Sequence, residues 1–231
     1  MPYRPTTKTE QKKEVMRQRL IAAARLLFAR QGYEATTLQQ VVTEAETSIG
    51  NCYFYFANKE TLLLAVAEQF RCEVAQEIDA AITPLSPGPL LLAVAVYTGV
   101  LAVLRQPALA RVALFETAHP VLRSAAVELF ASRTSRILTE VPQGEGPSAH
   151  PILVAHAWQG AIQSTVEGVL TGRITDEPEI IARFLVSWNL RALGFSEEAV
   201  TATMRDALLP LNCFNKTLPT GLSTLAAKGV E

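Results

Sequence analysis

Apolar residues recur at helical spacing along almost the whole chain. Before Gly32, the residues Leu20, Ala24, Leu27 and Phe28 line one face of a helix, and glycine can adopt the left-handed conformation that ends it. Alternating strand-like runs bounded by turns do not occur in the sequence. The hydrophobic pattern therefore predicts an all-α fold.

Capping signals after this first helix predict where the next helices begin. Thr37 stands three residues before Gln40, which is the pattern of a capping box, and this second helix is expected to reach about Ala45. Ser48 and Asn58 are polar residues suited to the N-caps of a third and a fourth helix.

The fourth helix is expected to be long, because its apolar stripe keeps i, i+4 spacing from Leu62 to Ile78. Prolines and a glycine at 84–89 end it. A loop is expected at 142–148 and a partly disordered tail at 212–231. Further helices are predicted at about 90–105, 107–118, 120–139, 150–171, 177–193 and 196–208.

The composition is that of a compact globular protein. Hydrophobic residues make up 49% of the chain and charged residues 19%, which excludes a disordered or collagen-like chain. Apolar stretches fall short of the roughly 18 to 20 residues of a membrane span, and the N-terminus lacks a secretory signal. The three cysteines have no CxxC spacing, so neither disulfides nor a zinc site is expected. We expect a cytoplasmic protein without metal, cofactor or membrane partner.

The net charge of −1 hides an asymmetry. Residues 1–60 carry nine basic and six acidic side chains, whereas residues 61–231 carry twelve and sixteen. The excess is largest in residues 1–30, with eight basic against two acidic side chains. A basic end on a neutral body suggests a polyanionic partner, although an ordinary solvated terminus would show the same excess.

Residues 37–54 point to a more specific function. Two short helices separated by a tight turn, after a longer helix, form a helix-turn-helix, whose second helix can enter the major groove of DNA. Gly50 would let this helix approach DNA closely, and Asn51 could pair with a base edge or a phosphate. Groups that could reach phosphates come from Tyr53, Tyr55 and Lys59. A plain helical hairpin with an aromatic core, which Phe54 and Phe56 would fit, is the alternative.

Three motifs stand in order within 19–62. They are Leu-Phe-Ala-x-x-Gly-Tyr ending at Tyr33, Thr-Thr at 36–37, and Ser-x-Gly-x-x-Tyr-x-x-Phe-x-x-Lys-Glu-x-Leu over 48–62. Together, at this spacing, they resemble the N-terminal domain of TetR-type transcriptional regulators.

The resemblance implies an all-α homodimer in which residues 1–60 bind DNA and residues 61–231 bind a small molecule and dimerise. The effector would release a repressor from a palindromic operator in double-stranded DNA, so the cytoplasmic protein would associate with the nucleoid when bound. The implied groove-facing residues are Ser48, Gly50 and Asn51. The implied phosphate-contacting residues are Thr37, Tyr53, Tyr55 and Lys59.

The sequence departs from the family pattern at four positions. Glu46 stands where the family usually has the turn glycine, which places a side chain and a negative charge in the bend. Val42 replaces the usual alanine and Cys52 a usual leucine. Tyr55 stands where histidine is common, but it still supplies a hydroxyl donor.

The helices expected at 150–171 and 177–193 are unusually apolar. Such faces suit a four-helix interface between two subunits, as the resemblance implies, or burial within one subunit. The candidate dimer residues are Ile152, Ile162, Val166, Val169, Ile181, Phe184, Leu185 and Trp188.

A ligand pocket is expected among the helices between Leu62 and Glu167, lined mainly by apolar side chains with a few polar groups. The scarcity of charge in this region favours a small, uncharged or aromatic effector. Each candidate could equally be an ordinary core residue. The candidates are Tyr97, Phe115, Glu116, His119, Phe130, Trp158, Gln159 and Gln163.

Two rival functions fit less of the sequence. Glu116 and His119 have the i, i+3 spacing of metal-carboxylate sites, but a di-iron bundle needs this motif twice and it occurs once. The sequence has no Gly-rich phosphate loop, serine elbow or Cys/His nucleophile arrangement, so an enzyme is not expected. A constitutive DNA-binding protein of the same fold, with a fully packed body and no effector, is the remaining alternative.

Overall fold

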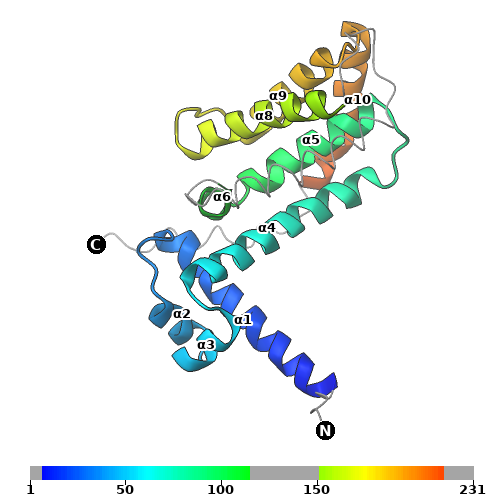
Figure 1. The fold of residues 1–231 in the computed structure, drawn as a ribbon. Coiled ribbons are helices and arrows are strands. Elements are labelled where there is room, and N and C mark those ends of the chain that lie inside the picture. The colour runs from blue at the N-terminus through cyan, green and yellow to red at the C-terminus, as the bar shows by residue number, and fades with distance from the viewer. Residues whose placement is uncertain (1–6, 115–150, 216–231) are drawn as a thin grey trace.

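The computed structural model describes residues 7–114 and 151–215, and all regular elements in these ranges are helices (Figure 1). The predicted all-α fold is confirmed. The helix expected at 120–139 and the loop at 142–148 lie outside the described residues. The helices are α1 (Thr7–Gln31), α2 (Leu38–Glu44), α3 (Ile49–Tyr55), α4 (Lys59–Ile82), α5 (Pro89–Leu104), α6 (Pro107–Leu114), α8 (Pro151–Leu170), α9 (Pro178–Ala192) and α10 (Glu197–Asn215).

Local signals define the ends of the first four helices as predicted. The chain leaves α1 through Gly32, whose φ of 81° lies in the left-handed region. Thr37 and Gln40 form both bonds of the capping box at the start of α2. Ser48 and Asn58 each cap their helix by accepting a hydrogen bond from a backbone N–H. At the other end of the chain, α10 continues to Asn215, beyond the expected end near residue 208.

The first core lies among α1, α2, α3, α6 and the N-terminal part of α4. Its largest fully buried side chains include Leu20, Phe28, Leu62 and Phe70. Residues of α6 belong to the same cluster, and this helix packs against both α1 and α4. The expected boundary at residue 60 therefore falls within the first turn of α4, and α6 joins the N-terminal core.

The second core is formed by α5, α8, α9 and α10, with α5 at its centre. Tyr97 and Leu92 of α5 and Leu185 and Leu190 of α9 are its largest fully buried side chains. Figure 1 shows α4 running from α1–α3 into this body, where its second half packs along α5. One continuous helix thus connects the two cores.

Within the described ranges, no single helix is long and apolar enough to cross a membrane. Taken together, α5 and α6 have the length and composition of a membrane span, but the two helices meet at an angle of 100°. Ten of the 16 residues of α5 and four of the eight residues of α6 are buried in the two cores.

Candidate DNA-binding surface

The turn between α2 and α3 is closed by a Schellman motif. The Thr47 N–H donates to the Val42 carbonyl at 2.9 Å, and the Glu46 N–H donates to the Thr43 carbonyl at 3.1 Å. Glu46 occupies the position in this motif that usually holds glycine, and its φ is 49°. A side chain in this left-handed conformation is unfavourable by roughly 1–2 kcal/mol. Glu46, which replaces the glycine usual in the family, therefore occupies the most restricted backbone position of the turn.

Arg19 of α1 holds this turn from outside. Its Nη2 donates to the Ala45 carbonyl at 2.9 Å and to Glu46 Oε2 at 3.1 Å. The carbonyl at the end of α2 gains a charged donor, and the Glu46 carboxylate gains a counterion. The negative charge in the bend is thus neutralised locally by the neighbouring helix.

One side of α3 is buried and the opposite side is open. Cys52 and Phe56 pack in the first core, at 0% and 4% exposure. Of the groove-facing candidates, Ser48 and Gly50 are exposed and Asn51 is half-buried. The other exposed side chains of this helix are Ile49, Tyr53 and Phe54. The helix therefore offers a continuous surface of small, polar and aromatic groups.

Gly50 lies in open space. A Cβ added at this position would have no neighbouring atom within 4 Å. Packing within the protein therefore does not require a glycine here, although glycine is a poor residue for a helix interior. Close approach of α3 to a base pair would require a residue without a side chain at the exposed start of the helix.

Asn51 and Lys59 are held by their surroundings. Asn51 Nδ2 donates to Thr47 Oγ1 at 2.8 Å, which orients the amide and leaves its oxygen as an acceptor. Lys59 Nζ donates to the backbone carbonyls of Tyr33 at 3.0 Å and Glu34 at 3.3 Å, and lies 4.2 Å from the Tyr33 ring centroid. A third donor of this ammonium group stays available for a phosphate.

The remaining phosphate candidates differ in accessibility. Tyr53 is 55% exposed, whereas Tyr55 is half-buried against the first core. Thr37 is exposed at the start of α2, but its hydroxyl already takes part in the capping box. These three residues and Lys59 stand on α3 or at the starts of α2 and α4, around the open side of α3.

Tyr97 and Trp158 are the buried members of the ligand-candidate set. The Tyr97 hydroxyl and the Trp158 indole N–H are enclosed in the second core, and neither atom lies within hydrogen-bond distance of a partner among the described residues. Burial raises the pKa of Tyr97; Arg183 opposes this shift and Glu179 adds to it. Gln159 and Gln163 are half-buried. The other candidates, Phe115, Glu116, His119 and Phe130, lie outside the described residues.

The dimer candidates separate onto two faces. Val166, Ile181 and Leu185 are buried in the second core of the single subunit. Ile162 and Val169 are half-buried against the same core. The remaining candidates, Ile152, Phe184 and Trp188, are exposed. Two further residues that were not predicted, Leu153 and Ile180, are exposed as well, and the exposed fractions of these five side chains are 45% to 64%.

The outer face of α9 follows a spacing that the sequence contains. Ile180, Phe184 and Trp188 recur at i, i+4 and i+8, while Ile181 and Leu185 form a second stripe one residue further on. Arg19 and Ile49 at the DNA-binding surface were not predicted from the sequence. Phe54, which the alternative interpretation placed in an aromatic core, is 65% exposed, whereas Phe56 is buried. Their roles depend on contacts between helices, which spacing along one helix does not reveal.

A helix-turn-helix joined by one long helix to a larger helical body defines the class, a DNA-binding protein with an appended all-α domain. Residues 20–66 match the family model described as "Bacterial regulatory proteins, tetR family". The chain therefore carries a domain of this family. The family and its relatives are transcriptional regulators and not enzymes.

Similarity to individual proteins extends from this region to the whole fold. The chain is 34% identical over 76 residues to the transcriptional regulator HbdR of Aromatoleum sp. (strain CIB), a match that covers 31% of this chain and 33% of HbdR. A tetR-family regulatory protein of Rhodococcus RHA1 has 26% identity and a TM-score of 0.60, covering 79% of this chain and 98% of that one. RolR, solved with resorcinol, has 20% identity and a TM-score of 0.64, covering 84% and 95%.

Proposed function

We propose that this protein is a sequence-specific transcriptional repressor, released from a palindromic operator by a small, mainly apolar or aromatic effector. Residues 1–60 would bind DNA, and residues 61–231 would bind the effector and dimerise. The observation that carries the proposal is the open side of α3, where Gly50 has no packing neighbour and Tyr53 is exposed. A helix held this way by caps and a buried opposite side is suited to insertion in the major groove.

The polar groups around α3 suit DNA in two ways. Ser48, Gly50 and Asn51 lie at the start of the helix, where helix-turn-helix proteins contact base edges. Thr37, Tyr53, Tyr55 and Lys59 flank them with hydroxyl and ammonium donors suited to phosphates. We infer that the first set determines the sequence preference and the second set the register on the duplex.

The exposed face of α8 and α9 supports a homodimer. Phe184 and Trp188 are 56% and 45% exposed, which is unusual for such large apolar side chains clustered on one face. Neighbouring α8 offers small exposed residues at Ala157 and Gly160, and a Cβ at Gly160 would have no neighbour within 4 Å. Two-fold pairing of this face would bring the bulky stripe of one subunit against the small residues of the other. The two α3 helices would then read a palindrome.

The effector would bind beside Tyr97 and Trp158. A buried hydroxyl and a buried indole N–H without partners among the described residues are unfavourable until a ligand or water accepts their hydrogen bonds. Both side chains are aromatic, which favours an aromatic molecule with a hydrogen-bonding group. The two charged groups that act on the Tyr97 hydroxyl, Arg183 and Glu179, have opposite signs. Resorcinol, the ligand held by RolR, has this chemistry.

Coupling between the two sites would pass through the junction of α1, α4 and α6. Arg25 of α1 forms an ion pair with Glu73 of α4 at 2.5 Å and a hydrogen bond to Gln106 Oε1 at 2.7 Å, just before α6. Arg105, at the end of α5, pairs with Glu77 of α4. A ligand that displaced α5 or α6 would thus pull on α4 and change the separation of the two α3 helices. Equal separations in free and ligand-bound structures would contradict this coupling.

The DNA-binding proposal can be tested with Gly50→Ala. The wild-type protein should form a sharp complex in a mobility shift with DNA flanking its own gene, or with a duplex selected from a random library. The variant should keep or raise the melting temperature, because alanine favours the helix by about 1 kcal/mol and meets no neighbour. Its specific complex should weaken at least tenfold, since a methyl group would stand between α3 and the bases.

Asn51→Ala serves as the second variant, and Arg173→Ala on the body is a control for surface substitution. A specific complex with equal affinity in all four proteins would contradict the proposed role of α3. If no duplex from the library binds the wild-type protein, the regulator proposal itself fails.

A further inference from the structure

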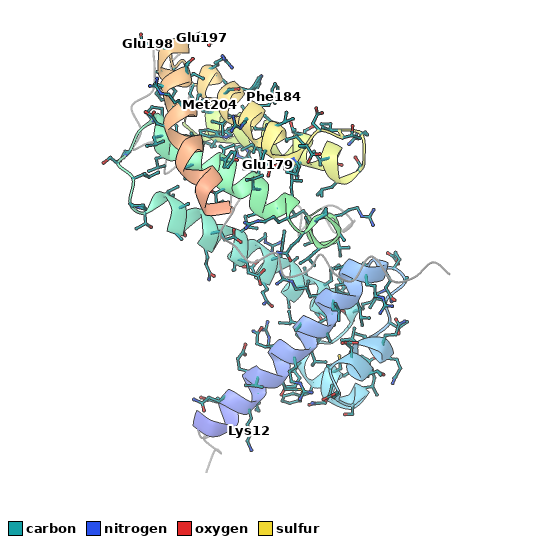
Figure 2. The ribbon with its side chains drawn as sticks, turned by 180° about the vertical axis from the view of Figure 1, so that it is seen from behind. Lys12, Glu179, Phe184, Glu197, Glu198 and Met204 are labelled. Carbon is teal, nitrogen blue, oxygen red and sulfur yellow. The ribbon has the colours of Figure 1, made fainter. Side chains whose placement is uncertain are left out.

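The N-terminal half of α1 projects beyond the core of the DNA-binding region. Leu20 is the first fully buried residue of this helix, and nearly every described residue before it is exposed. Figure 2 shows Lys12 at the free end of α1, away from the body. Lys12 precedes Leu20 by eight positions in the helix, which corresponds to about 12 Å along the axis. The projecting segment therefore carries its side chains about two helical turns beyond the core.

One face of this segment lies against the end of α3. Lys13 Nζ is 5.4 Å from the centroid of the Phe54 ring, and the Arg17 guanidinium is 5.7 Å from that of Phe56. Lys13 and Arg17 are four residues apart, so they share a face of α1. Cation–π contact with these rings brings the basic face of α1 alongside the proposed recognition helix.

Phe54 has no packing role that accounts for its position. It is 65% exposed, and its ring makes an edge contact with Tyr55 besides the contact with Lys13. An exposed phenylalanine next to a lysine leaves the ammonium group accessible while limiting where it can lie. Phe54 thus acts as a platform for Lys13.

The cations of this segment differ in their partners. Arg17 lies 3.6 Å from Glu14, and Arg19 is engaged by Glu46. Lys12 and Lys13 have no acidic partner among the residues that the structure describes. Two unneutralised lysines next to an open recognition helix suit a polyanion better than an acidic protein surface, because phosphates recur along the same duplex.

We propose that Lys12 and Lys13 bind phosphates of the DNA strand that flanks the bases read by α3, with Phe54 as the residue that positions Lys13. This contact rests on the proposed function, and adds to it a second, sequence-independent surface on α1. It would raise the affinity for specific and nonspecific DNA alike.

The test is the salt dependence of DNA binding by the full-length chain. Observed affinity should be measured over a range of salt concentrations for the wild type and for the double variant Lys12→Ala, Lys13→Ala. A plot of log K against log salt has a negative slope, and each lost phosphate contact should make it shallower by about 0.9. The double variant should therefore make it shallower by about 1.8 for each subunit bound. The preference for the specific duplex over a scrambled one should stay within about twofold of the wild type, because these lysines contact no bases.

Arg173→Ala, Arg205→Ala is the matched control. Both arginines are exposed on the body, so the control also lowers the net charge from −1 to −3. Its salt slope should equal that of the wild type. An equal fall in the control would show a general charge effect and overturn the proposal, as would an unchanged slope in the lysine variant.

The positioning role of Phe54 is tested by asking whether its effect on the salt slope requires Lys13. Phe54→Leu should lower the salt slope, whereas Phe54→Tyr should retain it, because a tyrosine ring can also hold the ammonium group. In a Lys13→Ala background, Phe54→Leu should have no further effect on the slope. An additive effect would overturn the positioning role.

The Gly50→Ala variant distinguishes a failure of the α1 contact from a failure of the proposed function. A loss of specific binding in Gly50→Ala with an unchanged slope in the lysine variant would support the regulator and overturn the α1 contact. Absence of DNA binding by the wild type would instead overturn the proposed function on which the contact rests.

Discussion

The helices around the proposed DNA-binding surface begin differently from α5 and α9 of the body. α2, α3 and α4 start at Thr37, Ser48 and Asn58, whose side chains each accept a hydrogen bond from the backbone N–H three residues on. α5 and α9 start with a proline after Gly88 and Glu177, and neither residue makes a side-chain capping bond. Directional hydrogen bonds define the first group, whereas proline and burial define the second. The start of α10 resembles the first group, because the Ser196 hydroxyl accepts a hydrogen bond from the Ala199 N–H at 3.2 Å.

For α2 and α3, the need for caps follows from helix length. α2 and α3 have seven residues each, too few for a helix to be stable by itself, while α5 and α9 have 16 and 15. Short helices need ends fixed by capping bonds to hold their side chains in place. Long helices can be held by the apolar face that they bury. Substitutions at core positions and at caps should therefore affect the two regions unequally.

The largest effect should come from truncating the core of the body. Leu185 is 1% exposed between α9 and α5, and Leu185→Ala should lower the free energy of unfolding by about 3 kcal/mol. Urea unfolding followed by circular dichroism, at one fixed protein concentration for wild type and variant, measures this loss. A change below 1 kcal/mol would contradict the view that burial holds the body together.

A smaller and different effect is expected one residue earlier. Phe184 is 56% exposed, so Phe184→Ala should leave the packing of a single subunit intact. If this ring is central to a dimer, its loss should weaken association by about 2 kcal/mol, or roughly thirtyfold. Sedimentation velocity over a dilution series measures the dissociation constant. Arg173→Ala, on the adjoining loop, should not change it.

These two neighbours show what the sequence could predict of the body. It predicted the apolar helices, but Ile181 and Leu185 were grouped with Phe184 and Trp188 because all four are large and apolar. Which stripe turns inward depends on how α9 lies against α5, and this is a property of the packed helices. The same holds for Tyr97 and Trp158, whose burial comes from contacts between helices distant in sequence.

The next effect concerns a cap. Ser48→Ala removes the acceptor for the N–H of Asn51 and should lower stability by about 1 kcal/mol. Glu177→Ala at the start of α9 is the matched control and should change stability by no more than about 0.5 kcal/mol, since Glu177 makes no capping bond. Urea unfolding of both variants compares the two regions directly. Equal losses would remove the distinction between capped and buried helices.

The helix-turn-helix could be predicted more fully than the body, because caps and turns are local. Thr37, Ser48 and Asn58 all occupy the cap positions that their types predicted. Glu46 shows where local reasoning stops. Its position in the turn was visible in the sequence, but the arginine that compensates for it lies 27 residues away on α1.

The smallest effect should be a gain in stability at this turn. Glu46→Gly relieves a left-handed conformation that is unfavourable by roughly 1–2 kcal/mol. It also removes the ion pair with Arg19, which is worth at most about 1 kcal/mol because the Glu46 side chain is 84% exposed. The bond from Arg19 to the Ala45 carbonyl remains possible. The variant should therefore gain about 0.5 kcal/mol in urea unfolding.

Glu46→Ala separates the two contributions, because alanine keeps the backbone strain and removes only the ion pair. We expect it to fall slightly below the wild type, so that the order of stability is glycine, glutamate, alanine. If glycine instead ranks below glutamate, the contact with Arg19 outweighs the strain, and α1 rather than the turn itself determines the angle between α2 and α3.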